Sequence, residues 1–426
     1  MPFSWSSLVV SSLLFGVGTA LSEAEAAAIA GSYAANIKVV KNPAYAIDVV
    51  EQIEVTTRSK VEAFIAKKVA AGTNNNCTLE NAGVRREWAD LRVDEREDYV
   101  RAVKCLMAMP ARAPKDRFPG AISRWDDFVA YHMTHAAELH DNYHLFPAHK
   151  HFMWVLETAL RNECGYKSWL PYMNYDRIAR DLVADGTGAT SPHFNGNSSS
   201  LGGTGDYDPL YTGVGSAQTR IPSGGGGGCI KAGHPFSEYN PFTNGTALNK
   251  RCLRRDLNKN AALGATADRV YKLMQSQDID TFYNMLLTPP RNLSDPYNWG
   301  VHSAGHYINA VDPGGDPMTS PGDPVFHFHH AALDRLWWMW QLQDIDNRLY
   351  SVPLYGTVVP MNMDHGGDMG GMGGMSTGEQ VEKRQRVTDP NKMVIDLEWL
   401  SDIKVPLLEA HDQLGGNRGQ FCYIYV

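Results

Sequence analysis

Long apolar runs and an excess of basic charge are both missing from this chain of 426 residues. Beyond the N-terminal region, no segment reaches the roughly 18 uninterrupted apolar residues that a membrane-spanning helix requires. Basic residues number 39 and acidic residues 47, which gives a formal net charge of −8. We therefore expect neither a membrane-embedded protein nor a nucleic-acid partner. Hydrophobic residues make up 43% of the chain, enough for a substantial core.

Cysteine is scarce, and no two cysteines are spaced as C-x-x-C. This absence argues against a zinc ribbon or a thioredoxin-like redox site. An oxidising compartment would join an even set of cysteines as disulfides. The set has six members: Cys77, Cys105, Cys164, Cys229, Cys252 and Cys422.

The N-terminal residues predict a signal peptide over residues 1–21. An apolar run from Leu8 to Val17 is followed by small residues, although no lysine or arginine precedes it. The alternative is a buried N-terminal helix. Four N-x-Ser/Thr triplets are candidate glycosylation acceptors, at Asn76, Asn197, Asn244 and Asn292. Together these features predict a secreted glycoprotein, with residues 22–426 as a single domain.

Several stretches have the apolar periodicity of helices. The predicted helices are Arg85–Met109, Asp126–His140, His149–Glu163, Ala262–Leu287 and Ala331–Arg348. Between Gly186 and Gly228 the chain is rich in glycine, serine and asparagine, which predicts a long irregular excursion. The expected fold class is therefore mainly α with long irregular loops and a few short strands.

Eleven of the 15 histidines fall in two short windows. His302 and His306 are four residues apart, so on a helix both imidazoles project from one face and can bind one metal ion. His330 can supply a third nitrogen. The first window offers His132, His140 and His149 in the same way. The other histidines of the two windows are His135, His144, His151, His327 and His329.

The histidine-only composition indicates which metal these sites hold. Imidazole suits zinc, copper, iron and nickel. A zinc hydrolase also needs a carboxylate beside its ligands, as in H-E-x-x-H, and the segment from His302 to His306 has none. Two sites of this composition favour a pair of redox-active ions. Copper is the natural candidate, because nitrogen ligands serve both of its oxidation states.

The segments around these histidines resemble the fungal tyrosinase and catechol oxidase family. In the first window the similar segments are Trp125–His132, Phe146–Phe152, Glu163–Tyr166 and Leu170–Tyr172. In the second they are Asn298–His306, Ser320–Pro324 and His329–Trp337. The resemblance covers roughly Arg85 to the C-terminus.

The resemblance implies a central four-helix bundle that holds a dinuclear, type 3 copper site. It assigns His132, His140 and His149 to copper A, and His302, His306 and His330 to copper B. His329 is the alternative to His330, and the remaining window histidines are expected to be structural. The implied activity is oxidation of o-diphenols, with o-aminophenols as further candidates, to o-quinones by O₂. The alternatives are a full tyrosinase with monophenolase activity and a non-catalytic, haemocyanin-like oxygen-binding protein.

The resemblance also implies supporting roles. Asp334 is expected to orient an imidazole N–H, and Arg335 to form a structural ion pair. Tyr423-Ile424-Tyr425 is similar to the tyrosine motif that closes the catalytic domain, within a closing segment 387–426, and no C-terminal lid domain is expected. Family precedent pairs Cys77 with Cys422, Cys105 with Cys164, and Cys229 with Cys252.

The sequence departs from the family at several positions. Glu138 stands where many relatives have a cysteine that forms a thioether, so His140 is expected to be held by packing and hydrogen bonds. Ser303 replaces a frequent asparagine, and Ser294, followed by Asp295, replaces a frequent glutamate. This weakens the expected monophenol hydroxylation. Two further positions are notable: Tyr307 is expected at the mouth of the site, and Lys150 replaces an arginine, a structural change.

A Gly- and Met-rich loop is predicted over residues 356–386. The methionines between Met361 and Gly378, with His365, could capture Cu(I), but a linker with chance methionines is the preferred interpretation. Lys383-Arg384 is a candidate processing site.

Overall fold

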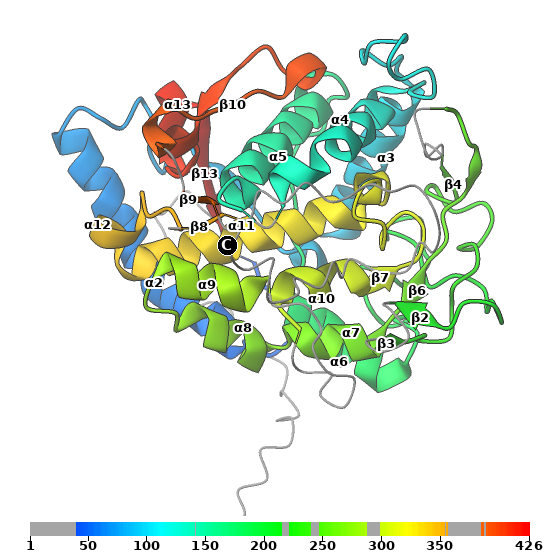
Figure 1. Ribbon diagram of the computed structural model, residues 1–426. Coiled ribbons are helices and arrows are strands. Elements are labelled where there is room, and N and C mark those ends of the chain that lie inside the picture. Colours follow the sequence, from blue (N-terminus) through cyan, green and yellow to red (C-terminus); the bar gives the residue numbers. More distant parts are fainter. Residues whose placement is uncertain are drawn as a thin grey trace, which may run out of the picture.

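The computed structural model describes residues 40–140, 142–214, 221–239, 247–287, 299–353, 355–356, 385–386 and 389–426. Outside these ranges lie the predicted signal segment 1–21, most of the loop 356–386 with Lys383-Arg384, and both Ser294 and Asp295. Within them the chain is mainly helical with a few short strands, as predicted (Figure 1). None of the helices in the described ranges combines the length and apolar character of a membrane span.

Helices account for most of the regular structure. The α-helices are α2 (Val49–Ala70), α3 (Val93–Ala108), α4 (Arg124–Leu139), α5 (Leu145–Asn162), α6 (Tyr175–Asp185), α7 (Lys259–Ala262), α8 (Ala267–Met274), α9 (Ile279–Leu286), α10 (Val301–Tyr307), α11 (Val325–Gln343), α12 (Ile345–Arg348) and α13 (Gly416–Gly419). The 3₁₀ turns are η1 (Trp88–Asp90), η2 (Leu263–Ala265), η3 (Ser320–Gly322), η5 (Pro390–Lys392), η6 (Glu398–Leu400) and η7 (Leu407–Ala410).

The strands are short and pair in small sheets. They are β1 (Gly83–Arg85), β2 (Gly213–Val214), β3 (Ile221–Pro222), β4 (Glu238–Tyr239), β5 (Arg251–Cys252), β6 (Asp256–Leu257), β7 (Asn309–Ala310), β8 (Tyr355–Gly356), β9 (Gln385–Arg386), β10 (Val394–Ile395), β11 (Val405–Pro406), β12 (Leu414–Gly415) and β13 (Phe421–Tyr425). In the one three-stranded sheet of the described ranges, β13 lies between β1 and β12. β13 runs parallel to β1, with Gly83 opposite Tyr423.

Local sequence explains where the first site-bearing helix begins. At the start of α4 the hydroxyl of Ser123 accepts a bond from the Asp126 amide, and the Asp126 carboxylate accepts one from the Ser123 amide. This reciprocal capping satisfies two backbone donors that the first turn would otherwise leave unpaired.

Two predicted helices begin earlier than expected. Helix α5 starts at Leu145, not His149, because Pro147 is tolerated in a first turn, where its missing amide proton has no acceptor to lose. Helix α11 starts at Val325, not Ala331, directly after Pro324. His149 and His330 therefore lie in the second turn of their helices, where the backbone is hydrogen-bonded on both sides.

The single helix predicted over Ala262–Leu287 is wrong. The chain forms α7, η2, α8 and α9 in succession. Thr266 has an extended backbone between η2 and α8, and Asp278 caps α9 by accepting from the Thr281 amide. Such local side-chain to backbone bonds compete with helix continuation.

Helix α11 lies at the centre of the molecule (Figure 1). It packs against α5, α2 and α10, and α4 in turn packs against α5. Of its 19 residues, the 18 from Val325 to Leu342 are buried. On the α2 side, the Arg335 guanidinium forms a buried ion pair with Glu54, which confirms its predicted structural role.

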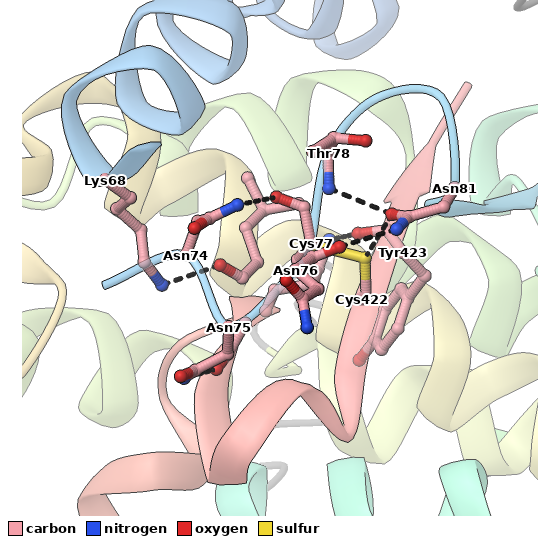
Figure 2. The surroundings of a disulfide bond; sticks show 12 residues. Lys68, Asn74, Asn75, Asn76, Cys77, Thr78, Asn81, Cys422 and Tyr423 are labelled. Atoms are coloured by element: carbon pink, nitrogen blue, oxygen red, sulfur yellow. Dashed lines mark hydrogen bonds between the residues drawn. A yellow bond between two sulfur atoms is a disulfide. The ribbon is translucent and has the colours of Figure 1, made fainter. Parts of the chain in front are cut away.

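All three predicted disulfides are present, joining Cys77 to Cys422, Cys105 to Cys164 and Cys229 to Cys252. Figure 2 shows the first, with Tyr423 next to it on β13. Because Cys77 precedes β1 and Cys422 lies in β13, this bond joins the same two segments of chain that pair in the sheet.

Candidate dinuclear metal centre

Three histidines of the first window converge. His132 lies on α4, His140 caps its C-terminus and His149 lies on α5. One ring nitrogen of each lies within 4.8 Å of the others, and all three residues are buried. Each Nδ1 faces a backbone carbonyl: Met318 at 2.9 Å, Ala136 at 2.7 Å and Leu145 at 2.7 Å, respectively. Because a carbonyl only accepts, each Nδ1 carries the proton and each Nε2 presents its lone pair.

Four histidines converge in the second window. His302 and His306 lie one turn apart on α10, and His329 and His330 are neighbours on α11. One ring nitrogen of each lies within 4.8 Å of those of the other three. The helical spacing predicted for His302 and His306 is confirmed. The structure adds His329 to the cluster without removing His330.

The two clusters face each other. The rings of His149 and His330 stack with centroids 4.0 Å apart and planes 10° apart. The ring centroids of His140 and His302 lie 5.8 Å apart across the same gap. Helices α4, α5, α10 and α11 therefore bring seven imidazoles into one buried volume.

The chemistry of this donor set fits metal ions. Burial first, and neighbouring histidines second, hold the pKa values of His132, His149, His302, His306 and His330 well below the ordinary value. The rings are therefore neutral, the form that binds a metal. The buried Nε2 atoms of these five histidines have no hydrogen-bond partner among the described residues. A buried acceptor without a partner is costly, and one cation in each cluster would give all five a partner.

Phe326 packs between the two clusters, and the sequence analysis missed it. Its ring centroid lies 4.2 Å from that of His330, 5.1 Å from that of His132 and 5.8 Å from that of His306. The signal was its place four residues before His330, one helical turn away on the same face of α11. An apolar ring at this point keeps water from the imidazoles that it touches.

The predicted role of Asp334 is corrected by its contacts. Its carboxylate accepts hydrogen bonds from the hydroxyls of Tyr423 and Tyr425, both at 2.7 Å, and pairs with Lys150 at 2.9 Å and Arg85 at 3.5 Å. It bonds to no imidazole in the described part of the chain. Burial alone would raise the pKa of Asp334, but Lys150 and Arg85 outweigh it and hold that pKa below the usual value.

This arrangement gives Lys150 a structural place, as predicted. Lys150 is next to His149 on α5 and fully buried, and it also donates to Gln413 at 3.3 Å. Burial lowers the pKa of Lys150, and Asp334 opposes that effect. The tyrosine motif of β13 thus contacts α11 one turn beyond His330, on the Asp334 side.

The remaining window histidines lie outside both clusters, as predicted. His135 stacks on Tyr131 and pairs with Glu398 at 3.2 Å. His151 and His327 each face a backbone carbonyl, at 3.0 and 3.1 Å. His144 precedes the first residue of α5.

The positions that depart from the family pattern have varied surroundings. Glu138 is exposed, and His140 is held through its Nδ1 and through Asn142, which donates to its carbonyl at 2.9 Å. This confirms that hydrogen bonds hold His140.

Ser303 is half-buried beside His302 on α10. Tyr307 is 2% exposed and packs on Trp299, and its place at the mouth of the site stays a prediction.

Comparisons with known proteins show the family to which this chain is related. Residues 122–343 match the family model described as the common central domain of tyrosinase. The chain is 36% identical over 321 residues to the tyrosinase-like protein orsC of Emericella nidulans, covering 67% of this chain and 80% of that protein. It is 34% identical over 306 residues to N-acetyl-6-hydroxytryptophan oxidase ivoB of the same organism. That alignment covers 65% of this chain and 80% of the relative.

A third relative, tyrosinase P of Aspergillus terreus, is 33% identical over 286 residues, covering 62% of this chain and 77% of the relative. Among solved structures, a mutant polyphenol oxidase from Thermothelomyces thermophila aligns with a TM-score of 0.71 and 29% identity. That alignment covers 88% of this chain and 97% of the other.

Proposed function

Because this chain belongs to the tyrosinase family of oxidoreductases, we propose that it is a dicopper oxidase converting o-diphenols to o-quinones. Two molecules of o-diphenol give up four electrons and four protons, which reduce one O₂ to two molecules of water. The observation that carries the proposal is the pair of facing, buried histidine clusters with unpartnered Nε2 atoms.

The proposed ligands are those of the two triads. His132, His140 and His149 would hold copper A, and His302, His306 and His330 would hold copper B. When bound, the two ions would supply the electron-transfer steps that couple catechol oxidation to O₂ reduction. The protein fixes the donors in advance, because the carbonyls at each Nδ1 of the first triad set its tautomers.

Ser303 supports a preference for diphenols. It stands beside His302, where an asparagine would help to hold a proton-accepting water near the phenol. A serine side chain is shorter and reaches less far. An o-diphenol depends less on such help, because its first proton is easier to remove. We therefore propose weak or absent monophenol hydroxylation, with Ser294 and Asp295 at the position of the usual glutamate.

The test compares 4-tert-butylcatechol with 4-tert-butylphenol on copper-loaded protein, because the two substrates differ by one hydroxyl group. We expect rapid quinone formation from the catechol and little from the phenol. His302→Ala should abolish turnover and halve the copper content, whereas His135→Ala, outside both clusters, should change neither. Reversible O₂ binding without quinone formation would instead identify a haemocyanin-like carrier.

Full tyrosinase activity is the second candidate, favoured by relatives that are named tyrosinases. Ser303→Asn separates the two candidates. If the asparagine position controls proton removal, this variant should raise the ratio of phenol to catechol turnover several-fold. Wild-type protein that already hydroxylates the phenol as fast as it oxidises the catechol would reject the diphenol preference. A hydroxyindole deserves assay too, given the relative that is named an oxidase of N-acetyl-6-hydroxytryptophan.

We also propose that the protein is secreted and glycosylated. Three disulfides support this, because such bonds persist in oxidising compartments. Two acceptors, Asn76 and Asn197, are exposed in the described ranges. Mass spectrometry of protein from the culture medium should find an N-terminus near Ser22 and glycan on these asparagines. Intact protein retained inside the cell would reject the proposal.

A further inference from the structure

We infer that an N-linked glycan on Asn76 lays its first sugars in a cavity beside the Cys77–Cys422 disulfide. The inference rests on the proposed secretion and glycosylation and does not involve the copper centre. The cavity has a volume of about 490 Å³, and pockets that hold small ligands have roughly 300–1,000 Å³. Its lining residues come from four parts of the chain: residues 75–81, helix α5, Trp169 and residues 419–423.

One wall of the cavity is aromatic. Trp154 on α5 is half-buried and packs against Phe421 with ring centroids 6.4 Å apart. Its exposed part borders the cavity. The C–H groups of a sugar ring form an apolar surface between its hydroxyls, and such a surface packs well on an aromatic ring. Trp154 therefore offers apolar surface against which a sugar can lie.

The other walls carry fixed hydrogen-bonding groups. The Arg161 guanidinium lies 3.9 Å from the centre of the Trp169 ring and donates to the Ser168 carbonyl at 2.6 Å. These contacts hold it at the cavity wall with further N–H donors. The side-chain amides of Asn162 and Gln420 also line the cavity. Both kinds of group can pair with the hydroxyl and acetamide groups of N-acetylglucosamine, the sugar that N-linked glycans attach to asparagine.

Asn76 places the attachment point at the same cavity. It begins the triplet Asn76-Cys77-Thr78, is exposed and is one of the lining residues. Its backbone carbonyl accepts a hydrogen bond from the Asn81 amide at 2.5 Å, while its side-chain amide makes none in the described part of the chain (Figure 2). An attached glycan holds its sugars beside the cavity at a roughly millimolar effective concentration. Contacts too weak to capture a free sugar are therefore sufficient.

The order of events in biosynthesis allows this arrangement. Cys77 lies inside the triplet, and its partner Cys422 follows 345 residues later, so Asn76 can be modified before the bond forms. Residues 419–423 then complete the cavity around a sugar already in place. Because both cysteines line the cavity, that sugar also covers the disulfide. A thiol needs access to a sulfur atom to reduce such a bond.

The test follows the release of individual glycans by peptide N-glycosidase F from secreted, full-length protein, with mass spectrometry of each glycopeptide. Asn197 is the matched control, because it is exposed and lies outside the cavity. A glycan that must leave the cavity before cleavage is released more slowly, so we expect release from Asn76 to be at least about tenfold slower than from Asn197 in the native protein. After reduction and denaturation the two rates should be similar.

Variants locate the cause of the protection. Trp154→Ala removes the aromatic wall, and Thr158→Phe fills the cavity from a half-buried position on α5. Each should bring the release rate at Asn76 to within about twofold of that at Asn197. Tyr271→Ala removes an aromatic side chain that is 38% exposed on α8, away from the cavity, and should leave the protection unchanged.

The disulfide gives a second readout. Thr78→Ala removes the acceptor triplet and keeps Asn76 itself. Dithiothreitol should reduce the Cys77–Cys422 bond several-fold faster in this variant than in the glycosylated wild type, because the sulfur atoms are no longer covered.

Equal native release rates at the two sites, or a glycan on Asn197 with none on Asn76, would overturn the inference and leave the proposed copper oxidase intact. Unchanged protection in both cavity variants would overturn it too. So would a structure of the glycosylated protein with a free phenol in the cavity and the glycan in solvent. Secreted protein without glycan on any asparagine would overturn the proposed glycosylation as well.

Discussion

At the scale of single residues, the charges that support the site are as buried as the histidines themselves. The buried cations Lys150 and Arg85 are compensated by Asp334 and, for Arg85, by Glu157 at 2.9 Å. The two tyrosine hydroxyls donate hydrogen bonds to Asp334. Removing one member of a buried pair leaves the other charge without compensation, which costs more than the pair contributes.

Asp334→Asn should therefore lower the free energy of unfolding by about 3–5 kcal/mol. The amide has the same shape but removes the carboxylate that pairs with Lys150, whereas Arg85 keeps its pair with Glu157 at 2.9 Å. Tyr425→Phe is the matched comparison, because it removes one hydrogen bond to the same carboxylate and should cost about 1 kcal/mol. Urea denaturation of the copper-free proteins measures both. An equal loss in the two variants would contradict this account of the ionic network.

His411 gives a residue-scale prediction about pH. Burial lowers the pKa of His411 to about 3, whereas the unfolded chain has an ordinary value of 6.5. Below pH 6.5 the unfolded state binds a proton that the folded state does not, so stability falls as pH falls from 6.5 towards 3. His411→Gln should remove up to about 1.4 kcal/mol per pH unit from that slope. Thermal melts of both copper-free proteins between pH 4 and 8 test this, and parallel curves would contradict it.

Of the ligand candidates, His302 and His306 could be predicted from local spacing, and the resemblance to a family supplied the rest. His302 and His306 need only one turn of helix to converge. The partners of Asp334 could not be predicted, because Tyr423 lies on a strand and Lys150 on another helix. Only packing brings these three together, and no periodicity in the chain encodes that contact.

At the scale of elements, the presence of a helix was predicted better than the residues at which it begins and ends. Helices α4, α5 and α11 were all expected, but α5 and α11 begin before the first clear apolar repeat. The chain breaks between α7, α8 and α9 at two residues: Thr266 has an extended backbone, and Asp278 caps α9. Neither residue is a strong helix-breaking signal in the sequence. Tertiary packing decides such cases, and a local pattern cannot.

The Ser123 cap of α4 makes a prediction at this scale. Ser123→Ala removes the hydroxyl that accepts from the Asp126 amide and should cost about 1 kcal/mol of stability. Thr266→Ala is the control, because Thr266 also precedes a helix but its side chain makes no capping bond. Differential scanning calorimetry should show a lower midpoint for the first variant only. Similar shifts in both would mean that the capping bond contributes little.

At the scale of the whole molecule, the disulfides close loops of very different length. Cys77 and Cys422 are separated by 345 residues, and Cys229 and Cys252 by 23. In the chain-entropy account, a cross-link that closes a longer loop restricts the unfolded state more. The longer cross-link also holds β13, whose tyrosines donate hydrogen bonds to Asp334 on α11.

Replacing Cys77 and Cys422 together by serine should cost up to about 6 kcal/mol, and replacing Cys229 and Cys252 about 3 kcal/mol. Guanidinium denaturation under non-reducing conditions compares the two double variants. The first should also weaken copper retention, because β13 is freed to leave Asp334. Equal stability losses with unaltered copper retention would argue that the β1–β13 pairing holds without its cross-link.

The wide separation of Cys77 from Cys422 has a consequence for biosynthesis. At about 5–20 residues per second, roughly 20–70 s pass between the synthesis of the two cysteines. During that interval the four cysteines between them emerge, and each can react with the waiting thiol of Cys77. A nascent chain must therefore keep one thiol uncommitted while two shorter loops close. The yield of native protein should then depend on the disulfide isomerase of the producing cell.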